Sequence, residues 1–132
     1  MKIAIVVCRV LLGLGFVIFG LNILVPFMPQ PPPPEGSPVA QFLALFGPTH
    51  WMHVVGLFQL VGGLLVLIGR TAPLGLALLA PVLVNILLFH LCLMGGAGLV
   101  PGLVFSAFEL FLLYSYRSYF RSILTTHASP TL

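Results

Sequence analysis

The sequence predicts an all-α integral membrane protein, an antiparallel bundle of four transmembrane helices. Charged residues make up 5% of the 132 residues and hydrophobic residues 60%, whereas an ordinary soluble domain carries about 25% charged residues. A soluble chain of this length has too much surface for its volume to bury so much apolar material. The low charge and high hydrophobicity also exclude a disordered chain.

Four apolar runs predict the helices, with spans at about residues 3–28, 50–69, 73–94 and 99–118. A bilayer core of about 30 Å needs about 20 apolar helical residues, and each run is close to that length. Lipid offers no hydrogen-bond partners to an open sheet edge, so these spans must be helical. We expect one domain over residues 1–124 and a flexible tail over residues 125–132.

The cations predict the orientation of the bundle. Lys2 precedes the first span, Arg70 lies between the second and third, and Arg117 and Arg121 follow the fourth. The two remaining loops contain no Lys or Arg, so the positive-inside rule places both termini in the cytoplasm and those loops outside. Five cations spread along the chain form no basic patch, so the expected partner is the lipid bilayer and not a nucleic acid.

The outer loop after the first span is rich in proline, with four consecutive prolines at Pro31–Pro34. Proline fixes φ and lacks an N–H, which favours polyproline II. This piece is either a rigid spacer or a lid over the outer mouth of the bundle. The apolar run over residues 39–46 predicts a short interfacial helix that ends at Gly47.

Four polar residues, one from each span, fall in one layer near the middle of the membrane: Arg9, Gln59, Asn85 and Glu109. Polar groups at this depth are costly and are functional candidates. An unpaired charge would be the most costly, so we expect a salt bridge between Arg9 and Glu109. The pair either fixes which helix meets which or supplies a proton-accepting carboxylate. Gln59 and Asn85 would then form hydrogen bonds with the carbonyl or hydroxyl of a lipophilic ligand.

A second polar layer lies nearer the outside and contains Asn22, His53 and His90. Two histidines at equal depth on two helices can bind haem or a metal. Neither histidine belongs to a ligand motif, however, so hydrogen bonds to the outer loop are favoured, and we expect neither a metal site nor haem. Cys8 and Cys92 form no Cys-x-x-Cys pair and are expected to be packed thiols.

Several of these segments resemble the DoxX family of small bacterial membrane proteins. Residues 9–22 (RVLLGLGFVIFGLN) resemble its first helix, and residues 80–90 (APVLVNILLFH) are the most specific match. The Pro-rich loop, Gly62-Gly63 and Glu109-Leu110 follow in family-like order and spacing, so the resemblance spans residues 1–124. One departure is Gln59, where similar proteins often have a glutamate.

The resemblance implies a four-helix bundle in the bacterial inner membrane and an association with membrane redox complexes. Three function hypotheses remain open. The chain holds a quinone-like ligand near the polar layers, through Arg9, Gln59, Asn85, Glu109, Asn22, His53 and His90. Alternatively, it is an accessory or assembly subunit of a larger membrane complex, and purification as a homo-oligomer alone would count against that hypothesis. The third hypothesis is a small transporter or channel. No catalytic residue is identified, so a subunit or ligand-binding partner of a membrane oxidoreductase is favoured over an independent enzyme.

Overall fold

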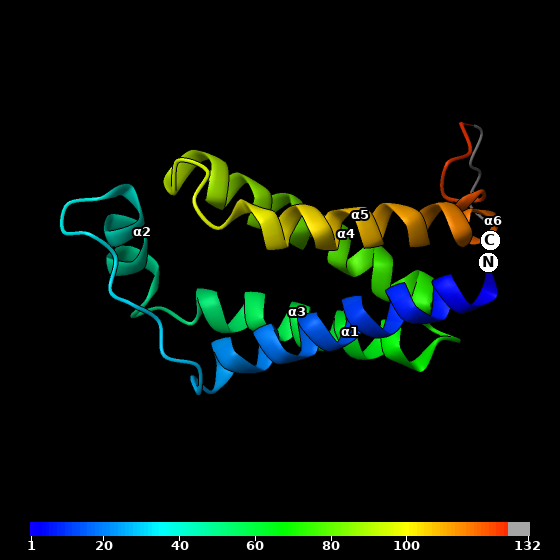
Figure 1. Cartoon of the computed structure of the whole chain (residues 1–132), viewed down its shortest axis with the longest axis horizontal. Helices are drawn as coiled ribbons and strands as arrows, with labels where there is room; N and C mark the ends of the chain where they lie inside the picture. Colours follow the sequence, from blue (N-terminus) through cyan, green and yellow to red (C-terminus); the bar gives the residue numbers. More distant parts are fainter. Residues whose placement is uncertain (127–132) are drawn as a thin grey trace, which may run out of the picture.

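The computed structural model describes residues 1–126, and all its regular secondary structure in that range is helical (Figure 1). A long Pro-rich connection that carries one short helix joins the first two of the four longer helices, and short connections join the others. The elements are α1 (Lys2–Leu24), α2 (Pro38–Phe46), α3 (Trp51–Ile68), α4 (Ala72–Leu88), the π-helix η1 (Phe89–Leu93), α5 (Leu99–Ser115) and α6 (Arg117–Phe120).

The four longer helices form a closed ring of contacts, because α1 packs on α3, α3 on α4, α4 on α5, and α5 on α1. Three of them are long and apolar enough to cross a membrane: α1, α3 and α4 with its η1 extension. α5 is apolar but shorter, with 17 residues. The N-terminus and α6 lie at one end of the bundle, and α2 lies at the opposite end (Figure 1). The all-helical fold of the described residues is therefore confirmed, and three of its helices are compatible with a membrane-spanning bundle.

Two helix ends differ from the expected bounds. The first span ends at Leu24 and not near residue 28, because Val25 is extended (φ −134°, ψ 90°), the conformation that a following proline favours. The side-chain oxygen of Asn22 then accepts the backbone N–H groups of Phe27 and Met28 at 3.0 and 2.8 Å. The last span ends at Ser115, and α6 follows it separately. Residues 127–132, most of the expected tail, lie outside the described residues.

α2 begins at Pro38, one residue before the expected position, and Ser37 is its N-cap. Its hydroxyl accepts the backbone N–H of Ala40 at 3.2 Å, which satisfies one of the free donors of the first turn. Pro38 fits the first helical position because its missing N–H is not needed there. The short helix in the loop is thus confirmed, and no residue of α2 is buried.

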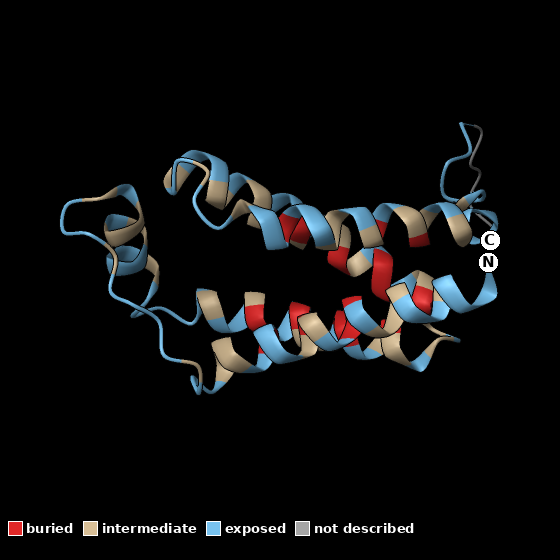
Figure 2. Cartoon of the chain, in the orientation of Figure 1, coloured by how far each residue is buried: buried red, intermediate tan, exposed pale blue. Residues whose placement is uncertain are grey.

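Glycine contacts hold the helices together. A Cβ on Gly20 would lie 2.6 Å from the backbone nitrogen of Leu60, and one on Gly75 would lie 2.8 Å from the carbonyl oxygen of Gly62. Such backbone approaches are the usual way in which helices pack in lipid. Buried residues lie where α1, α3, α4 and α5 face one another, as the colouring of the ribbon shows (Figure 2). The largest fully buried side chains are Leu12, Phe16, Val66, Leu76, Leu79 and Leu112.

The bundle is less tightly packed towards its α2 end. Both α2 and η1 contain no buried residue, whereas the core side chains of α3 and α4 lie at Val66, Leu76 and Leu79. α3 and α4 therefore meet closely at their connected ends. Their other ends leave space for the site described next.

Candidate functional site

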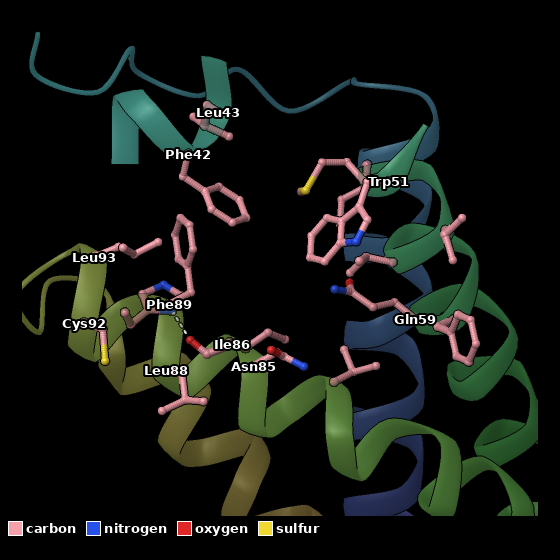
Figure 3. A pocket seen from close by; sticks show the side chains of 17 residues that line it. Phe42, Leu43, Trp51, Gln59, Asn85, Ile86, Leu88, Phe89, Cys92 and Leu93 are labelled. Carbon is pink, nitrogen blue, oxygen red and sulfur yellow. Dashed lines mark hydrogen bonds between the residues drawn. The ribbon is translucent and has the colours of Figure 1, made fainter. Parts of the chain in front are cut away.

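A cavity of about 620 Å³ lies between the first half of α3 and the second half of α4, beneath α2 (Figure 3). Ile23 of α1 closes part of its back wall. Ligand pockets for small molecules usually measure about 300–1,000 Å³ and combine an apolar lining with a few polar groups. Both conditions hold here, because aliphatic and aromatic side chains dominate the wall. No Asp, Glu, Lys or Arg is among the described residues that line it.

Two amides from the expected polar layer reach this cavity. Gln59 points into it from α3 and Asn85 lies on the α4 side (Figure 3). Gln59 is 4% exposed, and its Oε1 is buried without a hydrogen-bond partner. Asn85 donates from Nδ2 to the carbonyl oxygen of Pro81 at 3.1 Å. Gln59 therefore contributes to a largely apolar wall an amide whose oxygen has no hydrogen-bond partner.

His90 also lines the cavity, in the π-helix that extends α4. Its Nδ1 lies 2.8 Å from the carbonyl oxygen of Ile86. Since a carbonyl only accepts, Nδ1 carries the proton of this hydrogen bond. On the other side of the ring, a Cβ on Gly98 would lie 3.3 Å from Nε2. The ring of His90 thus lies beside Gly98, the residue that precedes α5. π-helical turns such as η1 are frequent at functional sites.

Aromatic contacts cover the α2 end of the cavity. The ring of Phe42 lies 5.4 Å from that of Phe89 and 6.1 Å from that of Trp51, centre to centre. Phe46 lies 4.8 Å from Trp51. Such offset and edge-on pairs add about 0.5–1.5 kcal/mol each beyond their burial. α2 therefore covers the cavity through ring contacts.

Asn22 lies beside a second, more open hollow of about 690 Å³ under the Pro-rich segment. Its oxygen is already used by the turn after α1, so its role in the structure is to end that helix. Ile23, Leu43 and Met52 line both hollows and separate them.

The expected salt bridge between Arg9 and Glu109 is wrong. Glu109 is 3% exposed, and both its carboxylate oxygens are buried without a hydrogen-bond partner. The guanidinium of Arg9 lies instead at Gly69, where an added Cβ would be 2.8 Å from Cζ. Gly69 ends α3, and the partial negative charge of a helix C-terminus stabilises a cation there. Neither charge lines the cavity.

His53 is exposed and does not line the cavity. Its ring lies edge-on to that of His50, with 5.6 Å between the ring centres. His90 is instead hydrogen-bonded to the carbonyl oxygen of Ile86, so the two histidines do not form a pair. The described residues contain no group of three or more His, Cys, Asp or Glu that could hold a metal. Of the seven candidate residues, the cavity brings together Gln59, Asn85 and His90.

The family is established by a sequence comparison. The DoxX family model matches residues 4–94, which is more than half of the chain. The chain belongs to the DoxX family. No curated protein and no solved structure matches it. The matched part of this DoxX protein includes all the residues that line the cavity and ends just after η1.

Sequence reasoning missed the aromatic part of this DoxX site. The sequence placed Phe42 only in a short interfacial helix, and Trp51 and Phe89 only within two apolar spans. The π-helical turn at Phe89–Leu93 has no pattern of its own in the sequence. The useful signal was the position of Trp51 and Phe89 at the same end of two antiparallel spans, next to the loop that carries Phe42.

Proposed function

We propose that this DoxX membrane protein holds a quinone-like lipophilic ligand in the cavity between α3 and α4, as a ligand-binding partner of a membrane redox complex. The observation that carries the proposal is Gln59, a buried amide with an unpartnered oxygen in the wall of an apolar cavity. An unused buried polar group costs stability, and of the three residues with such a group, Arg9, Gln59 and Glu109, only Gln59 lines the cavity that a ligand can fill.

The chemistry of the wall supports a neutral head group. An amide donates to a carbonyl and accepts from a hydroxyl, so Gln59 and Asn85 can serve either the oxidised or the reduced form of a quinone. No Asp, Glu, Lys or Arg of the described residues lines the cavity, and His90 already uses Nδ1 within its own helix. The site therefore suits holding a ligand more than exchanging protons with it.

Trp51 supplies the assay, because it is the only tryptophan of the chain and lines the cavity. A decyl-substituted benzoquinone added to the purified protein in lipid nanodiscs should quench the tryptophan fluorescence in a saturable manner. Val55→Phe places a larger side chain in the same cavity. It should raise the Kd obtained from this quenching about tenfold or more.

Val61→Phe is the matched control, because Val61 is an exposed residue of the same helix that does not line the cavity. The quinone should quench the tryptophan fluorescence of this variant with the same Kd as in the unmodified protein. Quenching that does not saturate, or that both variants change equally, would contradict a quinone site between α3 and α4.

A further inference from the structure

The cavity is closed on several sides by contacts of the bundle. Towards the termini, α3 and α4 meet at Gly62 and Gly75, where a Cβ on Gly75 would touch the opposite backbone at 2.8 Å. Behind it, α1 packs on α3 through Gly20 and Gly56. Over it, Phe42 contacts Phe89 and Trp51. No described residue of α5 lines the cavity.

The remaining side lies between α3 and α4 and is bordered by exposed apolar residues. Val54 and Phe58 of α3 are 51% and 44% exposed, and Leu88 of α4 is 50% exposed. All three also line the cavity. They belong to stripes of exposed apolar residues, because Val61 continues the stripe on α3, and Val84 and Leu91 flank Leu88 on α4. In a membrane protein such stripes face lipid, so the cavity opens towards the hydrocarbon of the bilayer.

We propose that the ligand is a neutral lipid with a compact carbonyl- or hydroxyl-bearing head and a long apolar chain, and that it enters sideways from the bilayer between α3 and α4. This inference rests on the proposed function and specifies the source and class of the ligand. The head lies near Gln59, whose buried Oε1 lacks a partner. The chain leaves between Phe58 and Leu88, where the apolar border continues into lipid.

The uncharged wall favours a neutral lipid over a phospholipid. A phosphate head group would need cations or several N–H donors, and no Lys or Arg of the described residues lines the cavity. An apolar border also gives no advantage to a ligand that arrives through water. The leaflet that supplies the lipid is the one at the α2 end, because the cavity lies in that half of the bundle (Figure 3).

The second hollow offers a competing route from the aqueous side. It lies under the Pro-rich segment and shares Ile23, Leu43 and Met52 with the cavity. A ligand that used this route would pass between those three side chains, and its entry would depend on Met52 and not on the opening between α3 and α4.

A cross-link across the opening tests the inference. Val54→Cys and Leu88→Cys are combined in a chain whose two natural cysteines, Cys8 and Cys92, are replaced by alanine. A bifunctional maleimide then joins α3 to α4 at the border of the cavity. The association of decyl-substituted benzoquinone, supplied in the lipid of the nanodisc, is followed by stopped-flow quenching of Trp51. We expect the cross-link to slow association about tenfold or more, because it blocks the entry path.

The matched control joins the same two helices at their other ends, through Leu64→Cys and Leu74→Cys. Both side chains are exposed, and neither lines the cavity. This cross-link should leave association unchanged. Unchanged association in the Val54–Leu88 cross-linked protein would overturn lateral entry, and slower association in Met52→Phe would then assign entry to the aqueous route. Absence of saturable quenching before any cross-link would overturn the proposed function itself, and the inference with it.

Discussion

Replacing Gln59 by leucine should change stability and ligand binding in opposite directions. Gln59 is 4% exposed and its Oε1 has no hydrogen-bond partner. A buried polar group left unpaired costs about 1–3 kcal/mol, and leucine removes that group while keeping a similar volume. The free energy of unfolding of Gln59→Leu should therefore rise by about 1–3 kcal/mol.

The same substitution should weaken binding of the quinone. A hydrogen bond to the ligand contributes about 0.5–1.5 kcal/mol net. Its loss corresponds to a Kd about two- to twelvefold higher, since about 1.4 kcal/mol is tenfold. Unfolding is measured by titration with SDS in mixed micelles, and binding by quenching of Trp51 fluorescence. Gains in stability that reduce function mark positions that are kept for function.

Gln41→Leu is the control, because Gln41 is exposed and lines neither hollow. Leucine removes the hydrogen bond that Gln41 donates to the carbonyl oxygen of Gly36. Gln41→Leu should therefore lower the free energy of unfolding by at most about 0.5–1.5 kcal/mol and leave Kd unchanged. Two results would refute the reasoning. Lower stability of Gln59→Leu would mean that the amide has a structural partner, and an unchanged Kd would mean that the ligand does not use it.

Three further substitutions test other parts of the account. Glu109→Leu should raise the free energy of unfolding by about 1–3 kcal/mol, because both carboxylate oxygens are buried without partners; lower stability in the SDS titration would reveal a partner. Gly69→Ala should lower the free energy of unfolding by about 1–3 kcal/mol, because φ at Gly69 is +80° and the added Cβ would meet the side chain of Arg9. Gly36→Ala has a similar φ of +72° in open space, so an equal loss there would argue against the Arg9 contact. Phe42→Ala removes ring contacts to Phe89 and Trp51 and should raise the quinone dissociation rate about three- to tenfold. Leu45→Ala, an exposed position of α2 outside the cavity, should leave that rate unchanged, and equal rates in the two variants would exclude α2 as a cover.

The helices were largely predictable because each is a long apolar run bounded by proline, glycine or charge. Pro26 shows the limit of that reasoning. The apolar run continues to Met28, but the helix ends at Leu24. Pro26 lacks a backbone donor, and the side-chain oxygen of Asn22 accepts the N–H groups of Phe27 and Met28. Helix ends depend on such local hydrogen bonds more than on hydropathy.

The candidate site was predictable only in part. Gln59 and Asn85 were expected in one layer, and they line one cavity. Arg9 and Glu109 were paired because opposite charges at similar depth attract. The prediction did not consider the C-terminus of α3, which competes for the guanidinium at Gly69. Depth along a helix could be read from residue number, whereas the direction of a long side chain depends on which neighbouring helix comes closest.

The most direct test of the central claim is mass spectrometry of the small molecules extracted from gently purified protein, compared between the unmodified chain and Val55→Phe. The account predicts a stoichiometric quinone or similar neutral lipid with the unmodified chain and much less with the variant, whose cavity is partly filled. Bulk phospholipid alone in both samples would contradict it, and would favour an accessory subunit in which the buried polar groups serve helix packing.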